Sequence, residues 1–347
     1  MKKSKISKVV LINLVVILLG LFGIELLARI RLHARFDISS PLYSIKSIVK
    51  ALINTGGDWE HLNQSNIHRK PYPYLMFKGA PNAKDHNYLG YRIADPITPN
   101  TINIALFGGS TGYQGSPPII NLLTQKLNYE KDATQYAPLN FSVVSSNHNQ
   151  HLHSLVENYT KYPIDMIVFY GGYNETLQSA FYDPRPGFPY NFRIRNEMSP
   201  EEMLLIKHSV LYKQIEKYLS KSPLSQPFTS SWNNAIVENY ILTMDTARLL
   251  SKSLTTGRCK TPFLFIYQPY QMSEEQGVPE SYRDQVHNKI KYHVIASKDG
   301  IDLSDLFNES IGEYTDIVHL KQSGRKVVAR KILESNLFKN AIKSCSN

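Results

Sequence analysis

Short apolar runs separated by helical patterns dominate the chain beyond residue 100. Five such runs predict strands, at residues 102–107, 141–144, 165–170, 262–267 and 301–303. The runs are largely apolar at successive positions and rich in β-branched and aromatic residues, which is typical of strands covered on both faces in a parallel sheet.

Helical periodicity lies between these runs and after the last one. It predicts helices over residues 118–127, 151–162, 201–219, 233–254 and 324–337. Alternating strands and helices predict an α/β fold, a three-layer α/β/α sandwich with a mostly parallel sheet and right-handed crossovers. In such sheets, ligands bind beyond the carboxyl ends of the strands.

The N-terminal residues follow a different pattern. Residues 9–28 are apolar except for Asn13 and Glu25, and twenty helical residues span about 30 Å, the thickness of the hydrocarbon core of a bilayer. No small-residue cleavage site closes this run, so we expect an uncleaved transmembrane helix rather than a signal peptide.

The charges around this run predict its orientation. Four lysines precede it (Lys2, Lys3, Lys5 and Lys8), and three arginines follow it (Arg29, Arg31 and Arg35). The lysines place the N-terminus in the cytoplasm, and a long following domain is translocated despite the arginines. We therefore expect a single-pass protein of the cell membrane whose main domain is extracytoplasmic.

Composition and charge exclude several classes of protein. The chain has 39 Lys and Arg against 29 Asp and Glu, but seven of these basic residues lie within residues 1–35, so a nucleic-acid partner is not expected. A hydrophobic content of 42% excludes a disordered chain. The two cysteines, Cys259 and Cys345, exclude a disulfide scaffold, and the sequence leaves open whether they pair.

We expect three regions along the chain. Residues 1–35 form the cytoplasmic tip and the anchor, residues 36–100 a linker and an N-terminal extension, and residues 101–347 the main domain. Within this domain, residues 176–231 are an insertion rich in proline and aromatic residues. The insertion forms either a lid or wall of the substrate site or a packed structural excursion.

Three short motifs carry candidate chemistry. Gly108-Gly109-Ser110 ends the first predicted strand, Asn174 follows the third, and Asp316 and His319 lie three residues apart before the last helix. A serine at a tight turn, an imidazole oriented by a carboxylate and an amide donor together suit acyl transfer. Taken singly, each has a simpler explanation. Ser110 can be a helix cap, Asn174 a turn residue or a glycosylation site, and Asp316 and His319 an unrelated pair on the surface. The glycines do not follow a phosphate-binding pattern.

With these motifs the chain resembles the SGNH, or GDSL-type, hydrolases, in particular their membrane-anchored members. The resemblance covers roughly residues 100–337 and implies a flavodoxin-like fold and esterase activity. It implies that Ser110 is the nucleophile, His319 the general base and acid, and Asp316 the residue that orients His319. It further implies that the Ser110 backbone N–H and the Asn174 amide bind the oxyanion.

The sequence departs from the family after the second predicted strand, where the family has a glycine whose N–H also binds the oxyanion. Residues 143–150 contain no glycine. Asn147 is the best match, because asparagine tolerates the left-handed backbone that directs such an N–H. The neighbouring His148, His151 and His153 fit a polar helix start better than a metal site, and no cofactor is expected.

The resulting functional hypothesis is a membrane-anchored serine esterase. Its expected substrates are O-acyl groups, in particular O-acetyl groups, of an envelope glycan or a similar ester. Two alternatives stay open. One is a catalytically weakened carbohydrate-binding or assembly factor in polysaccharide export, and the other is an O-acyltransferase.

Overall fold

The structure is a computed structural model, and two compact units make up the chain. One unit comprises Met1–Gln64 and Arg193–Lys221, and the other comprises Ser65–Phe192 and Ser222–Asn347. The structure describes residues 2–36, 69–73, 75–82, 85–93, 100–130, 134–177, 185–190, 192, 209, 211–212, 228–256, 259–272, 278–308 and 310–346.

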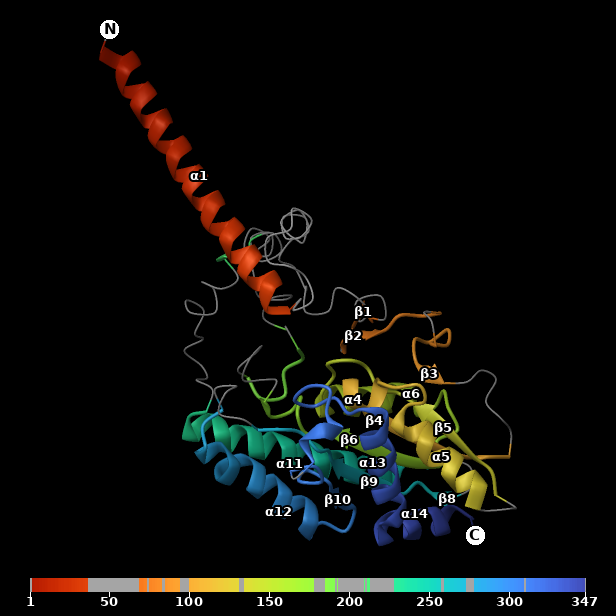
Figure 1. The fold of residues 1–347 in the computed structure, drawn as a ribbon. Coiled ribbons are helices and arrows are strands. Elements are labelled where there is room, and N and C mark those ends of the chain that lie inside the picture. The colour runs from red at the N-terminus through yellow and green to blue at the C-terminus, as the bar shows by residue number, and fades with distance from the viewer. Residues whose placement is uncertain are drawn as a thin grey trace. The chain divides into compact units, whose positions relative to one another are not determined.

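The first unit contains the long helix α1 (Lys2–Phe36), drawn in red in Figure 1. Its segment Val10–Ala28 has a mean hydropathy of 2.6 and is not buried, so it is long and apolar enough to cross a membrane. Within this segment, Glu25 Oε2 accepts hydrogen bonds from Ser209 Oγ at 2.7 Å and from the Leu211 backbone N–H at 2.9 Å. The helix predicted over residues 201–219 otherwise lies outside the described residues.

The second unit is built on a six-stranded sheet of order β10-β9-β6-β4-β5-β3. Its strands are β3 (Arg92–Ile93), β4 (Ile102–Gly108), β5 (Tyr136–Asn140), β6 (Met166–Gly171), β9 (Phe263–Tyr267) and β10 (Gly300–Asp302). All neighbours are parallel except β3, which pairs antiparallel with β5. In chain order the parallel strands follow the 2-1-3-4-5 arrangement of flavodoxin-like folds, which confirms the predicted fold class.

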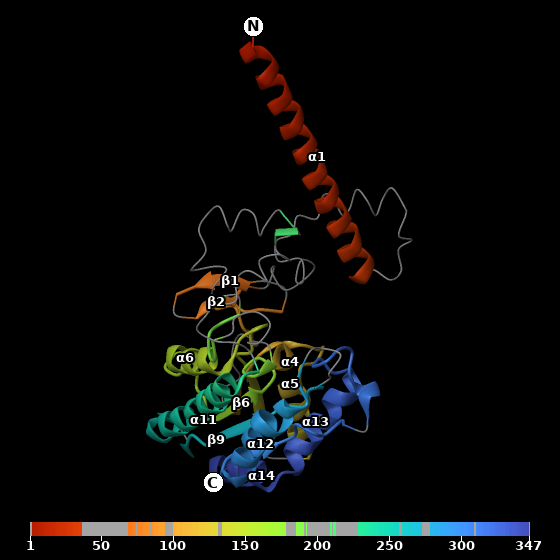
Figure 2. The same ribbon diagram turned by 90° about the vertical axis from the view of Figure 1, so that its left-hand side faces the viewer.

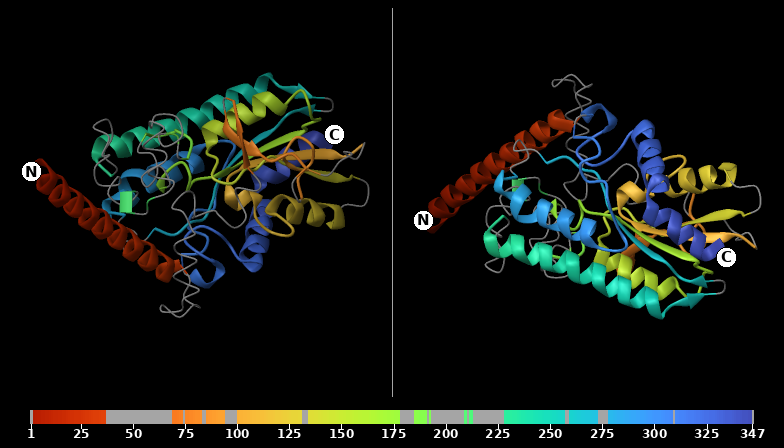
Figure 3. Two further views of the ribbon diagram at one scale, coloured as in Figure 1. Left: turned by 90° about the horizontal axis from the view of Figure 1, so that it is seen from above. Right: turned by 90° about the horizontal axis from the view of Figure 1, so that it is seen from below.

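Helices cover both faces of this sheet (Figures 1 and 2). One face carries α5 (Ile119–Glu130), α13 (Gln322–Glu334) and α14 (Asn336–Ser346), and the other carries α6 (His148–Asn158), α11 (Ser230–Ser253) and α12 (Asn288–Ala296). The views along the vertical axis in Figure 3 show the strands between the two helical layers. Shorter elements are α4 (Ser110–Tyr113), the π-helix η3 (Arg283–His287), the 3-10 helix η4 (Ile311–Glu313), and two hairpins, β1 (Arg69–Tyr72) with β2 (Met76–Gly79) and β7 (Thr255–Thr256) with β8 (Cys259–Lys260).

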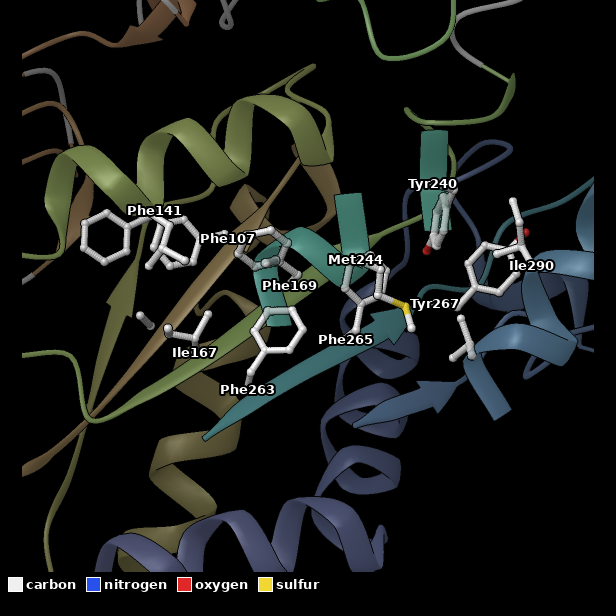
Figure 4. Packing of buried hydrophobic residues seen from close by; sticks show 14 of the residues in the cluster. Phe107, Phe141, Ile167, Phe169, Tyr240, Met244, Phe263, Phe265, Tyr267 and Ile290 are labelled. Atoms are coloured by element: carbon white, nitrogen blue, oxygen red, sulfur yellow. The ribbon is translucent and has the colours of Figure 1, made fainter. Parts of the chain in front are cut away.

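Side chains that alternate along each strand contribute to two buried cores, one on each face of the sheet. In β4, Ala105 and Phe107 belong to the core under α6 and α11, whereas Ile104 and Leu106 belong to the core under α5 and α13. Successive side chains of a strand point to opposite faces, so a sheet covered on both sides needs apolar residues at every position. Figure 4 shows the first core, in which the Phe107 and Phe141 rings stack with centroids 4.8 Å apart.

Two predicted elements differ from the structure in more than the placement of their ends. The strand predicted at residues 141–144 is wrong, because the regular strand β5 ends at Asn140. The N–H groups of Phe141 and Val143 still donate to Leu106 and Gly108, so the ladder continues without regular strand geometry. The helix predicted at residues 324–337 is two helices, α13 and α14, separated at Ser335.

The cysteine question that the sequence left open has an answer in this unit. Cys345, in α14, is disulfide-bonded, and Cys259, in β8, is the only other cysteine of the chain. The elements that carry them, β8 and α14, lie in contact.

Phe169 in β6 lies at the centre of the core in Figure 4, with no exposed surface and its ring 5.5 Å from that of Phe107. We expect Phe169→Ala to lower the free energy of unfolding by about 3–5 kcal/mol, because the remaining side chains cannot fill the cavity. Tyr129→Ala, at a side chain 89% exposed, is the matched control and should change it by less than about 0.5 kcal/mol. Urea unfolding of the full chain in detergent, followed by the fluorescence of buried Trp232, measures both; equal effects would contradict the packing described here.

Candidate active site

The candidate residues converge at the carboxyl ends of β4 and β6. These strands are adjacent and parallel, with Gly108 opposite Tyr170. The connection that leaves β4 passes over one face of the sheet and the connection that leaves β6 passes over the other. Such a switch point leaves a crevice beyond the strand ends, where ligands bind in open α/β sheets.

Ser110 is the first residue of α4, directly beyond β4. Two hydrogen bonds hold this short helix to neighbouring strands: Thr111 Oγ1 donates to Gln268 Oε1 at 2.7 Å, and Asn140 Nδ2 donates to the Gly112 carbonyl at 3.1 Å. The position of α4, and with it of Ser110, is therefore held by a side chain at the end of β5 and one in the loop after β9.

His319 reaches Ser110 from a loop more than two hundred residues later. Its Nε2 lies 2.7 Å from Ser110 Oγ, and its Nδ1 lies 2.6 Å from Asp316 Oδ2. Because the carboxylate can only accept, Nδ1 carries the proton and Nε2 presents its lone pair to the hydroxyl. The structure thus brings Ser110, His319 and Asp316 into one hydrogen-bonded chain.

The loop that carries this pair is closed by its own hydrogen bonds. Tyr314 and Leu320 form a bridge across its base, and the Thr315 N–H donates to the His319 carbonyl at 2.7 Å. Asp316 Oδ1 accepts from the Val318 and His319 N–H groups at 2.9 and 2.8 Å. Partial burial opposes ionisation of Asp316, but the bonds from His319 and from these N–H groups hold the pKa of Asp316 below its ordinary value. The carboxylate stays charged, which favours the imidazolium that forms when His319 accepts a proton.

Asn174 lies beside the turn that carries Gly109 and Ser110. Its Nδ2 donates to the Ser146 carbonyl at 2.7 Å, and a Cβ placed on Gly109 would come within 2.3 Å of the same nitrogen. Only glycine at position 109 allows this approach. This nitrogen has no other hydrogen-bond partner among the described residues.

Asn147 is placed differently from the sequence prediction. The expected left-handed backbone at Asn147 is wrong, because its φ is −111° and it is the N-cap of α6. Its N–H donates to Gln150 Oε1, and its amide donates to the carbonyls of Gly187 and Phe188. The backbone N–H that the prediction assigned to the oxyanion is therefore engaged in a capping box, and the side chain fixes the turn at residues 187–188.

Ser145 has the conformation that was expected at Asn147. Its φ is +66°, in the left-handed region that favours glycine. It is buried, and its N–H has no hydrogen-bond partner among the described residues. Nothing in the residue type indicates this backbone, so sequence reasoning missed it.

One group of side chains among the described residues could hold a metal: His148, His151 and Glu175, whose ligand atoms lie within 4.8 Å of one another. All three are buried. The imidazoles bond to each other through their Nδ1 atoms at 3.0 Å, and both Glu175 oxygens accept backbone N–H groups. Of the ring nitrogens and carboxylate oxygens in this group, only His148 Nε2 is buried without a hydrogen-bond partner. The other atoms are already used as donors and acceptors, so the cluster fits a hydrogen-bond network better than a metal site.

No protein-family model and no curated protein matches the chain. Solved structures similar to it include a lipase/acylhydrolase from Enterococcus faecalis, with 14% identity and a TM-score of 0.42 over 70% of this chain and 97% of that one. A variant of an acetyl xylan esterase from Geobacillus stearothermophilus is 13% identical, with a TM-score of 0.40 over 67% of this chain and 93% of that one. A member of the lipolytic G-D-S-L family from Veillonella parvula is 13% identical, with a TM-score of 0.38 over 68% of this chain and 98% of that one. At these identities the likeness is one of general fold and carries no argument about activity.

Ser145→Gly tests the left-handed backbone before α6. Glycine adopts a φ of +66° without the steric cost of a Cβ, so we expect the variant to be more stable than the wild type by up to about 1 kcal/mol. Ser145→Val should lose more than that amount, because a β-branched side chain fits this region worst. Urea unfolding of the full chain in detergent measures both. A Ser145→Gly variant less stable than the wild type would contradict the described conformation.

His151→Gln tests the burial of the histidine pair. Burial lowers the pKa of His151 to about 3 from 6.5, so below pH 6.5 the unfolded chain binds a proton that the folded chain does not. Stability present above pH 6.5 is therefore lost as the pH falls. From pH 5.5 to 4.5, we expect the unfolding free energy of the wild type to fall by about 1.4 kcal/mol more than that of the variant. His153→Gln, at an exposed position of the same helix, should behave as the wild type; if it instead matches His151→Gln, the assignment to His151 fails.

Proposed function

We propose that the chain is a serine esterase of the SGNH type in which Ser110, His319 and Asp316 are the catalytic residues. The observation that carries the proposal is the continuous chain of short hydrogen bonds from Asp316 through His319 to Ser110 Oγ. Its place at the switch point of the sheet adds support, since a substrate bound there lies against the hydroxyl.

The reaction follows from the roles of these atoms. His319 Nε2 takes the Ser110 proton as Oγ attacks the ester carbonyl, and Asp316 stabilises the imidazolium. The tetrahedral intermediate collapses when His319 gives the proton to the departing alcohol, which leaves an acyl group on Ser110. A water molecule, deprotonated by His319, then attacks this acyl group and releases the acid.

The oxyanion in each step needs donors that face it before charge develops. We propose three: the Ser110 backbone N–H, the Asn174 amide and the Ser145 backbone N–H. Ser145 replaces Asn147 in this role, because Ser145 has the left-handed backbone and an N–H without a partner among the described residues. The missing glycine then need not abolish activity, since its conformation is kept.

We further propose that α1 anchors the protein in the cell membrane with its N-terminus in the cytoplasm and the catalytic unit outside. The apolar segment Val10–Ala28 and the lysines before it support this orientation. An esterase in that location meets the O-acyl groups of envelope glycans, and O-acetyl esters are the substrates we propose. The catalytic residues named here include no ligand set for a metal, nucleotide or redox cofactor.

A fluorophosphonate probe tests the nucleophile directly. The full chain in detergent should form a Ser110 adduct and hydrolyse a simple acetyl ester, and Ser110→Ala should abolish the adduct and lower kcat by about 10³-fold or more. Ser344→Ala, a substitution of a serine in α14, is the matched control and should keep both activities.

Two outcomes would count against the proposal. A wild type that forms no adduct at high probe concentration favours a binding or assembly factor. Acetyl transfer to an oligosaccharide that exceeds hydrolysis favours an O-acyltransferase.

A further inference from the structure

We propose that Glu175 and the pair His148–His151 are positioning residues that hold the Asn174 amide and the Ser145–Ser146 turn in the geometry of the oxyanion site. This inference rests on the proposed function and deepens it. The three side chains lie behind the site, are 4%, 1% and 2% exposed, and take no part in the mechanism above. They act through Ser146 and through the turn that carries Asn174.

The contact nearest to the chemistry is the bond from Asn174 to Ser146. The Ser146 carbonyl accepts one N–H of the amide at 2.7 Å and so fixes the direction of the other. A Cβ on Gly109 would come within 3.1 Å of the same carbonyl, so Gly109, Asn174 and Ser146 pack against one another. A small shift of Ser146 would therefore turn the amide away from Ser110.

His151 holds Ser146 in place. The Ser146 hydroxyl lies 2.7 Å from the Val143 carbonyl and 2.8 Å from His151 Nε2. The hydroxyl has one proton, and the carbonyl can only accept it, so Nε2 must carry a hydrogen and donate to Ser146 Oγ. This assigns the neutral Nε2–H form to His151 and leaves its Nδ1 as an acceptor.

His148 completes the same chain of donors. Since His151 Nδ1 accepts, His148 Nδ1 donates to it across 3.0 Å. Burial lowers the pKa of His148 well below 6.5, which keeps the pair neutral and the direction of these bonds fixed. The centroid of the His148 ring lies 5.7 Å from that of Phe169 and 4.6 Å from that of Phe265. This apolar packing keeps water from competing for the hydrogen bonds of the two histidines.

Glu175 connects this chain to the loop that carries Asn174. Oε1 accepts from the His148 backbone N–H at 2.8 Å, and Oε2 accepts from the Gly172 N–H at 2.7 Å. One side chain therefore joins the start of α6 to the turn after β6, directly beside Asn174 in the sequence. Because two of the three proposed oxyanion donors, Asn174 and Ser145, come from these two loops, a buried contact between the loops fixes their separation before substrate binds.

A double-mutant cycle with Asn174→Ala tests the proposal on the full chain in detergent. We expect Glu175→Gln, which puts a donor opposite a backbone N–H, to lower kcat for an acetyl ester by about tenfold with KM changed by less than about twofold. In the Asn174→Ala background the same substitution should change kcat by only about threefold or less, because the Asn174 amide is gone and only the Ser145–Ser146 turn is left for Glu175 to position.

His151 supplies a second, milder pair of variants. His151→Gln keeps an N–H that can reach Ser146, and we expect it to retain at least about a third of the wild-type kcat, whereas His151→Leu should retain about a tenth or less. Glu157→Gln is the matched control, since Glu157 lies on the same helix and bonds Tyr72 and Lys78 away from the site. Glu157→Gln should leave kcat unchanged both in the wild type and in the Asn174→Ala background.

The outcomes separate the two proposals. A wild type without hydrolysis or a Ser110 adduct overturns the proposed function and, with it, the positioning roles. An active wild type in which the effects of Glu175→Gln and Asn174→Ala multiply overturns the positioning role alone. If Glu175→Gln fails to fold, the two His151 variants decide. An equal kcat for His151→Gln and His151→Leu then overturns the proposal.

Discussion

The bond between His319 Nε2 and Ser110 Oγ joins residues that are 209 positions apart, and it depends on nearly every layer of the second unit. The sheet must place the end of β4 beside the end of β6. In addition, α13 must pack on the opposite face from α11, so that the loop before α13, which carries Asp316 and His319, reaches the same edge of the sheet. Each requirement is met by burial of apolar side chains on both sides of the strands. The geometry of two polar atoms thus depends on apolar packing across the whole sheet.

The sequence predicted the parts of this arrangement that depend on continuous apolar patterns. Four of the five strands lie where the apolar runs indicated, because strands buried on both faces leave little choice of residue. The second strand was placed too late: β5 contains Pro138 and ends in Asn140, whereas Phe141 and Val143 have the apolar side chains expected of a strand. Tertiary pairing with β4 and β3, which the sequence does not display, selected the less apolar segment.

Site residues were predictable where their chemistry is unusual for a loop. Ser110, Asn174, Asp316 and His319 stand out because glycines or a fixed spacing accompany them, and the structure brings them to one edge. Ser145 carries no such mark, since serine is not a residue that favours a positive φ. The choice of Asn147 followed residue type, but an asparagine before a helix is also the best N-cap, and the capping box with Gln150 is what its side chain and N–H form.

The edges of the sheet have a consequence for the membrane anchoring proposed above. Proteins confined to two dimensions meet copies of themselves often, and an open strand edge invites intermolecular pairing. Here the parallel strands end in β10, of three residues, and on the other side β5 is partly covered by the two-residue antiparallel strand β3. Among the described residues, few backbone groups are left in a row for another chain to join, so the proposed anchoring does not expose a long strand edge to neighbouring copies.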